Sequence, residues 1–132
     1  MIRTAALAHI RDRRLIQTRS TGKTVFYMAG GKIDAGESAV DALHREIREE
    51  LGVGVTEVSE IGVFRAEAYG HAAGTQLHMT CFLAEVTDEP TPAGEIAEFR
   101  YFTGAEYAAM PEVAPGSLMV FQHLHELGLI DW

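Results

Sequence analysis

Residues 31–53 read GKIDAGESAVDALHREIREELGV, and this stretch decides the fold. Between Ser38 and Leu51 it contains no Gly or Pro, and strong helix formers dominate. Gly52 stands where a helix C-cap is expected, because glycine adopts the left-handed conformation without a steric penalty. We therefore predict a helix from Ser38 to Leu51, entered from a loop that begins at the Gly30-Gly31 pair.

The carboxylates of the predicted helix gather on one side of it. At roughly 100° per residue, Glu46, Glu49 and Glu50 fall within an arc of about 100°. Three carboxylates so close repel one another unless a cation compensates them. Oxygen ligands around open space suit Mg²⁺, a hard cation that keeps part of its water. The alternative is a Glu-rich helix face that is merely solvated.

The spacing of the residues around these acids is specific. Gly31 is followed by five residues, Glu37, seven residues and then the run REIREELGV over residues 45–53. This pattern resembles the Nudix box at every constrained position. The resemblance implies a Nudix fold, an α/β architecture with a mixed β-sheet sandwiched between α-helices, formed by residues 1–132 as a single domain. It also implies a hydrolase that cleaves a phosphoanhydride bond.

The resemblance also implies a role for each residue of the box. Mg²⁺ or Mn²⁺ would be held by Glu46, Glu49 and Glu50, often joined by the backbone carbonyl of Gly31. Arg45 is implied as an orienting residue, since it can pair with Glu49 four residues further on and fix that carboxylate.

The proton acceptor is expected among the carboxylates. In relatives the general base is a Glu of the box or one from a later loop, so Glu49 comes first and Glu95 is the extra metal ligand or base. Glu95 and Glu98 both precede a short predicted strand, and either is alternatively a plain surface acid. Glu37 is expected to stabilise the loop and helix, or to interact with the helix dipole. Gly30-Gly31 either forms a simple tight turn or lets the backbone approach metal and phosphates closely.

Outside the box, apolar and β-branched runs alternate with turn residues. The Gly70 to Gly74 region separates two strands and is expected to be a loop near a ligand. The expected elements are a hairpin of residues 2–10 and 15–18, strands over 25–28, 55–67, 76–86 and 99–102, and a helix over 117–127.

Composition limits the partners. The chain has 132 residues, 47% of them hydrophobic, enough for one domain with a buried core. Its formal net charge of −8 argues against a nucleic-acid polymer or an anionic membrane, because polyanions are normally bound by clustered Lys and Arg. A small nucleotide-like diphosphate remains compatible, because a divalent cation can lie between carboxylates and phosphates.

Cys81 is the only cysteine and lies in an apolar run, so we expect a buried thiol and a reducing, cytoplasmic compartment. Residues 1–10 lack the positive leader, long apolar core and cleavage site of a signal peptide, and no membrane span is visible. The C-terminal residues 129–132, LIDW, either pack against a partner in a homodimer or cover the chain's own core.

Several residues outside the box are candidates for binding substrate. Tyr69 lies sixteen residues beyond the box, where a tyrosine is similar to the pattern of dinucleoside polyphosphate hydrolases, although strand tyrosines also simply pack. His71 and His78 either line the pocket or are solvated. The candidates for phosphate contact are Lys23, Arg19 and Arg65, each of which is alternatively an ordinary surface cation.

The expected function is therefore Mg-dependent hydrolysis of a nucleoside triphosphate or a nucleoside diphosphate derivative. The rival is a Nudix-like regulatory domain that binds a nucleotide without turnover. Such domains usually lose acids of the box, whereas here Arg45 and all the acids are present. An isomerase of the same fold would need a catalytic Cys near the site, a role that does not suit Cys81 in an apolar strand.

Overall fold

The computed structural model describes all 132 residues, which form two β-sheets and three helices. The strands are β1 (Ile2–Ala8), β2 (Ile10–Arg11), β3 (Arg14–Ser20), β4 (Ala29–Lys32), β5 (Val55–Glu67), β6 (Gln76–Val86) and β7 (Ile96–Phe102), and the helices are α1 (Ala39–Leu51), α2 (Gly104–Ala108) and α3 (Pro115–Glu126).

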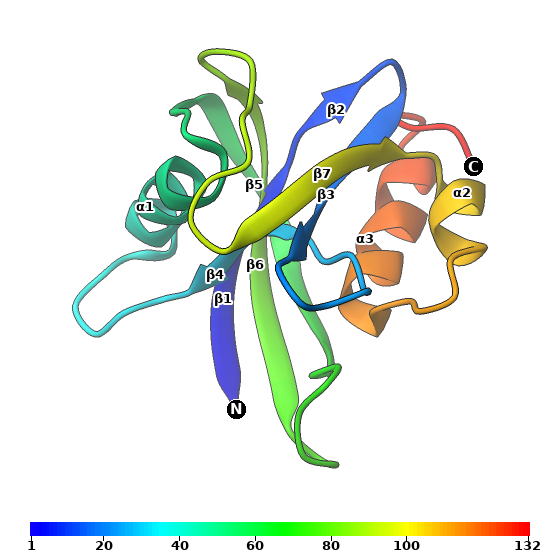
Figure 1. The fold of residues 1–132 in the computed structure, drawn as a ribbon, viewed down its shortest axis with the longest axis horizontal. Coiled ribbons are helices and arrows are strands. Elements are labelled where there is room, and N and C mark those ends of the chain that lie inside the picture. Colours follow the sequence, from blue (N-terminus) through cyan, green and yellow to red (C-terminus); the bar gives the residue numbers. More distant parts are fainter.

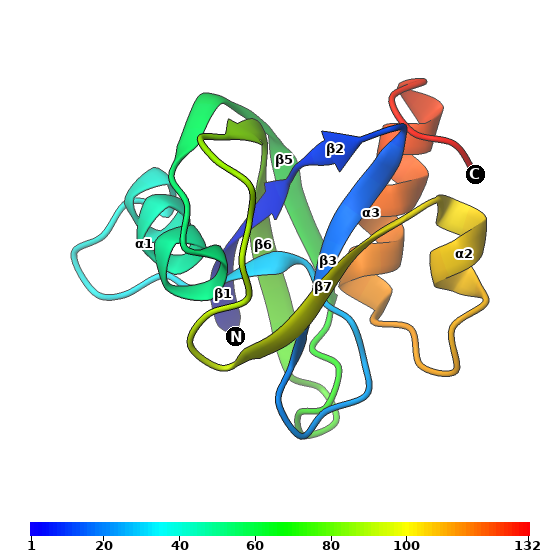
Figure 2. The same ribbon diagram turned by 45° about the horizontal axis from the view of Figure 1, so that its top comes forward.

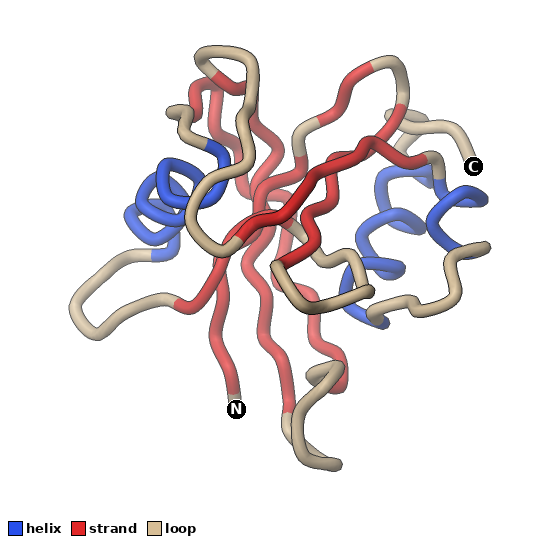
Figure 3. The backbone as a smooth tube through the Cα atoms, in the orientation of Figure 1, coloured by secondary structure: helices blue, strands red, loops and turns tan.

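The sheets lie between the helices. The four-stranded sheet has the order β4-β1-β6-β5, and β1 runs parallel to β6 but antiparallel to β4. The three-stranded sheet, β2-β3-β7, is antiparallel and crosses the first sheet (Figure 2). Helix α1 lies on one side of the strands, and α2 and α3 lie on the other (Figures 1 and 3). The predicted α/β fold with a mixed sheet between helices is confirmed.

Strand β1 divides the core into two parts because successive side chains of a strand point to opposite faces. Ala5 and Leu7 belong to the apolar cluster beneath α1, together with the buried side chains of that helix. Ala6 and Ala8 belong to the cluster beneath α3. The small residues of β1 let both helices approach the sheet, so the strand next to the box is fixed from both sides.

Helix α1 begins and ends where the sequence predicts. Ser38 is the N-cap, and its hydroxyl accepts a hydrogen bond from the backbone N–H of Asp41 in a reciprocal capping box. Gly52 is the C-cap in the left-handed conformation, with φ of 67°, and its N–H donates to the carbonyl of Arg48. These two caps fix which face of the helix meets the sheet.

The predicted strand over residues 25–28 is wrong. This segment makes only an isolated bridge between Thr18 and Tyr27, and the regular strand is β4, which contains the glycine pair itself. Within the segment only Tyr27 pairs with the neighbouring strand β3, through two backbone hydrogen bonds of 2.8 Å with Thr18, and the residues beside it bind to side chains. The hydroxyl of Tyr107 donates to the carbonyl of Phe26, and the N–H of Met28 donates to the hydroxyl of Ser117.

The predicted N-terminal hairpin is correct only in its second half. The chain leaves the four-stranded sheet at His9, and only β2 pairs with β3, through a turn at Asp12 and Arg13. The short helix α2 was not predicted, although Thr103 and Glu106 form the capping box that marks its start. None of the helices is long and apolar enough to cross a membrane.

The C-terminal residues cover the chain's own core. Ile130 is fully buried, and the guanidinium of Arg13 donates to the carboxylate of Asp131 at 2.6 Å. The Trp132 ring lies so close to Gly104 that a Cβ there would come within 2.0 Å of it. Ile130 thus packs within the chain, whereas Leu129 and Trp132 are 37% and 43% exposed, and the homodimer stays a prediction.

Candidate active site

A cleft of about 470 Å³ opens beside β4, a volume typical of sites for small molecules. Its walls come from β1, β3, β4, the loop before β4, the β5–β6 hairpin and the first turn of α3. The candidate residues in its lining are Lys23, Gly31, Glu50, Tyr69, His71 and Glu95. The candidates that do not line it are Arg19, Arg45, Glu46, Glu49, Arg65 and His78.

The two glycines of β4 allow two close approaches. Gly30 pairs with Ala6 of β1 at a φ of 136°, and a Cβ there would lie 2.0 Å from the carbonyl oxygen of Ala5. Gly31 faces the helix, and a Cβ there would lie 2.5 Å from the carboxylate carbon of Glu46. The glycine pair therefore lies in a strand, where Gly30 admits the neighbouring strand and Gly31 admits an acid of the box.

Glu50 is a largely buried carboxylate at the edge of the cleft. Its Oε1 accepts a hydrogen bond of 2.9 Å from the N–H of Gly30. Burial, together with the negative charges of Glu46, Glu49 and Glu95, raises the pKa of Glu50 to about 8, although the hydrogen bond from Gly30 lowers it. A cation among these acids would favour the ionised form of Glu50.

The raised pKa of Glu50 predicts a pH-dependent stability. Between about pH 4.5 and 8 the unfolded chain loses this proton while the folded chain keeps it, so the free energy of unfolding falls as the pH rises. Urea unfolding in EDTA at several pH values should show a decrease on the order of 5 kcal/mol across this window. Glu50→Gln should flatten the decrease, and an equal slope in the variant would contradict the assignment.

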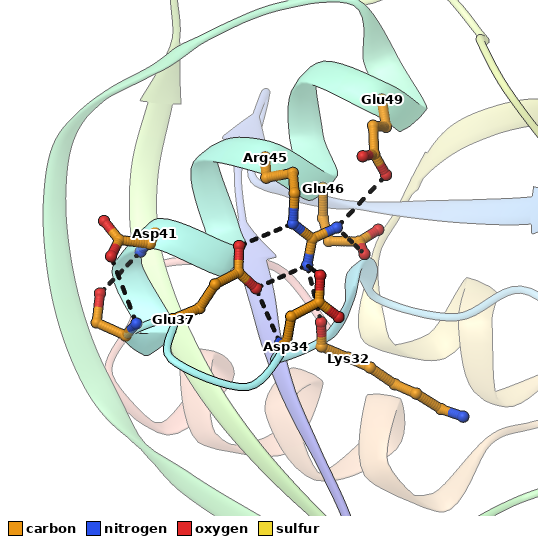
Figure 4. A network of polar contacts seen from close by, with 8 residues as sticks. Lys32, Asp34, Glu37, Asp41, Arg45, Glu46 and Glu49 are labelled. Atoms are coloured by element: carbon orange, nitrogen blue, oxygen red, sulfur yellow. Dashed lines mark hydrogen bonds and ion pairs between the residues drawn. The ribbon is translucent and has the colours of Figure 1, made fainter.

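Arg45 holds the loop and the acids of the helix together (Figure 4). Its guanidinium donates to both oxygens of Glu37, at 2.8 and 2.9 Å, and to Glu46 at 2.8 Å. The predicted pair with Glu49 is present but longer, at 3.5 Å. Glu37 also accepts from the N–H of Asp34, and its hydrogen bonds with Arg45 lower its pKa to about 2. The expected role of Glu37 in stabilising the loop agrees with these contacts.

The acids of the helix fit a hard divalent cation in chemistry and in space. All of them offer carboxylate oxygens, and Glu46 reaches the backbone of Gly31, where a metal could also meet the peptide carbonyl. In this structure, however, no three His, Cys, Asp or Glu side chains converge on one point, and Arg45 bridges Glu46 and Glu49. The side chain of Glu49 is 57% exposed, so it is free to turn toward a bound ion.

The opposite end of the cleft is aromatic. The rings of Tyr27 and Tyr69 meet edge to face at 6.3 Å, and the ammonium of Lys23 lies 5.8 Å from the Tyr27 ring. The hydroxyl of Tyr69 donates to Glu112 at 2.7 Å, and the hydroxyl of Thr24 donates to the same carboxylate. These contacts join the loop before β4, the β5–β6 hairpin and the segment before α3.

Arg19 and Glu98 are engaged with each other outside the cleft. The Arg19 guanidinium donates to Glu98 at 2.7 Å and to the carbonyl of Lys23 at 2.9 Å, and Glu98 also accepts from Arg100. Glu95, by contrast, lines the cleft near Glu50. Of the two acids before β7, Glu95, which was preferred as the extra metal ligand or base, is thus the one beside the cleft.

Lys32 and Tyr27 also line the cleft, although neither was among the candidates. Lys32 directly follows Gly31 at a free position of the box, so the pattern gave no signal for it. Tyr27 was assigned to a packing strand, although its partly exposed ring lines the cleft. Cys81 is fully buried in β6, and burial raises the pKa of its thiol to about 12, so it has no role as a nucleophile.

Part of the chain is similar in sequence to a known protein. It is 35% identical over 54 residues to the RNA pyrophosphohydrolase of Halorhodospira halophila (strain DSM 244 / SL1). That match covers 41% of this chain and 30% of the relative, so less than a third of the relative's length is matched.

Solved structures resemble the whole chain. The E. coli ORF135 protein superimposes with a TM-score of 0.77 at 24% identity, covering 97% of this chain and 91% of that one. The MutT NUDIX hydrolase from Burkholderia pseudomallei gives 0.77 at 20% identity, covering 92% and 95%. These likenesses establish the fold. The family model described as NUDIX domain matches residues 1–124, and the chain therefore belongs to the NUDIX family.

Proposed function

We propose that this chain is a Mg²⁺-dependent pyrophosphohydrolase that cleaves a phosphoanhydride bond in a nucleoside triphosphate or a nucleoside diphosphate derivative. One observation carries the proposal. Glu46 lies against the backbone of Gly31, and Glu50 accepts from the N–H of Gly30, so two acids of the box meet β4 beside a cleft of about 470 Å³. Carboxylates next to a cleft of this size suit a phosphate-bearing substrate held through a metal.

Glu46, Glu49 and Glu50 would hold Mg²⁺ or Mn²⁺, with the carbonyl of Gly31 as a further ligand. When bound, the ion neutralises charge on the diphosphate and acts as a Lewis acid toward water and phosphorus. Arg45 positions two of these acids from behind, through its hydrogen bond to Glu46 and its contact with Glu49. The charge of Arg45 also limits the repulsion between them before a metal arrives.

The remaining residues bind substrate and move the proton. Glu49 is the first candidate for the general base and Glu95 the second, since Glu95 lines the cleft without an ion pair. Lys23 and Lys32 both line the cleft and are placed to contact phosphate oxygens. Arg19 is the weaker candidate for that contact, because Glu98 holds its guanidinium.

The aromatic end of the cleft suits the flat ring of a nucleobase. Tyr27 and Tyr69 offer two ring faces, and the apolar side chains of Met28, Leu77 and Met79 line the space nearby. Aromatic stacking accepts any base, so this end alone does not select among nucleotides.

The test is a panel of substrates with Mg²⁺, comparing the wild type with Glu49→Gln. The panel holds nucleoside triphosphates, 5′-triphosphorylated RNA, ADP-ribose, dinucleoside polyphosphates and coenzyme A, and released phosphate or nucleotide is measured. We expect metal-dependent turnover of one class and a loss of about tenfold or more in kcat for Glu49→Gln. Glu126→Gln, which changes an exposed acid at the end of α3, is the matched control and should leave kcat unchanged.

The rival function predicts a different pattern. A regulatory domain would bind one compound of the panel without cleaving it, with or without metal. That outcome, measured by calorimetry on the wild type, would replace the hydrolase proposal.

A further inference from the structure

Helix α1 covers only part of its face of the four-stranded sheet. Strands β1, β5 and β6 extend beyond the helix toward the N-terminus (Figure 1). On this uncovered part, Arg3 of β1 is the direct partner of His78 of β6, and His78 is the direct partner of Arg65 of β5. Direct cross-strand partners point to the same face. Arg3, His78 and Arg65 therefore form a row of basic side chains across neighbouring strands.

The basic row lacks counter-charges. Most arginines of this acidic chain are paired with a carboxylate, as Arg11 is with Glu89 and Arg13 with Asp131. Arg3, Arg65 and His78 make neither an ion pair nor a side-chain hydrogen bond, and both arginines are exposed. In a protein with a net charge of −8, Arg3 and Arg65 flank the same residue of β6 and neither has an ion pair, so a bound anion would supply the missing counter-charge.

A second hollow, of about 300 Å³, lies against the basic row. Arg3 and His78 line it together with the hydroxyls of Ser38 and Thr80. The Ser38 oxygen accepts from the N–H of Asp41, which leaves its own proton free for an acceptor. The lining also contains one carboxylate, that of Glu37, but both of its oxygens already accept from Arg45. The free polar groups of the hollow are thus mainly donors.

We infer that the basic row and this hollow form a binding site for a phosphate-bearing anion, separate from the cleft. Guanidinium groups match phosphate oxygens in geometry, and the hydroxyl groups add neutral donors. The site is distinct because no residue lines both the hollow and the cleft. An anion bound at the row would therefore not exclude substrate from the cleft, and the inference does not depend on the proposed activity.

The test follows backbone amide shifts by NMR while inorganic pyrophosphate is added in EDTA at low salt. We expect saturable shifts at Arg3, Ser38, His78 and Thr80, which weaken as NaCl is added. The double variant Arg3→Gln/Arg65→Gln should bind at least about tenfold more weakly. Its amide spectrum shows directly whether the fold is kept.

Two further variants sharpen the comparison. Arg48→Gln removes an exposed arginine of α1 that has no ion pair and lies outside the hollow, so binding should stay the same. Val63 also lines the hollow and is 46% exposed. Val63→Lys adds a cation there, so pyrophosphate binding should tighten several-fold.

Three results would overturn the inference. The first is the absence of saturable binding in the millimolar range. The second is a set of shifts confined to the cleft, at Gly30, Gly31 and Lys32, with unchanged affinity in the double variant. The third is a double variant that alters only self-association in sedimentation experiments. That result would assign this face to contacts between copies of the chain.

Discussion

Gly31→Ala should fold like the wild type and lose about 100-fold or more in kcat. The new Cβ would lie 2.5 Å from the carboxylate carbon of Glu46 and 2.6 and 2.7 Å from its oxygens. This carboxylate is the far end of a flexible side chain, so it can move away at small cost to stability. In moving, it would leave the place where we propose that it binds metal, and a displacement of about 1 Å can reduce a rate by about 100-fold.

Two measurements and a control variant separate this effect from unfolding. Urea midpoints should differ little between Gly31→Ala and the wild type, while calorimetry should show weaker binding of Mn²⁺. Gly54→Ala is the matched control, because its Cβ would meet only side-chain atoms of Arg48 and Thr87, at 3.2 Å and beyond, outside the cleft. Full activity in Gly31→Ala would mean that the position of Glu46 beside β4 does not matter for catalysis.

The helix that carries the acids could be predicted from the sequence because its signals are local. Ser38 and Gly52 cap it, and the apolar positions between them recur with the helical period. The strands over 55–67 and 76–86 were also predicted with the bounds that the structure has. In each case the turn residues and the periodicity act within a few residues of the element that they define.

The segment before β4 could not be predicted in this way. Residues 25–28 have the composition of a strand, but only Tyr27 pairs with β3, while Phe26 and Met28 bind to Tyr107 and Ser117, which lie 81 and 89 positions away in the sequence. The same limit applies to the site. The spacing of the box singled out Glu46, Glu49 and Glu50, whereas the involvement of Lys32 and Tyr27 depends on where β4 and its preceding loop meet the β5–β6 hairpin.

For Arg45, the pair with Glu49 was predicted, but its shorter hydrogen bonds were not. Its pair with Glu49 follows from the helical spacing and is present, at 3.5 Å. Its shorter bonds include those to Glu37, in the loop that precedes the helix, and to the carbonyl of Lys32, at the end of β4. Helical periodicity describes neighbours within one helix, so contacts with a folded loop lie beyond its reach.

Gly30→Ala should have the opposite effect to Gly31→Ala, a large loss of stability. The new Cβ would lie 2.0 Å from the backbone oxygen of Ala5, and backbone in a paired strand cannot move away as a side chain can. The φ of 136° also lies in a region that only glycine adopts without strain. Together, strain and clash should cost about 3–5 kcal/mol, a large share of the stability of a domain this size.

Urea unfolding measures this loss directly, with Gly31→Ala as the neighbouring control. The two glycines stand side by side in the same short strand, so composition and helical or strand propensity do not distinguish them. If Gly31→Ala were instead the less stable protein, then Gly31, and not Gly30, would have to lie against the backbone of β1. Because a shift of one residue turns every side chain of a strand to the other face, this pair of substitutions tests the register that brings Glu46 and Glu50 to β4.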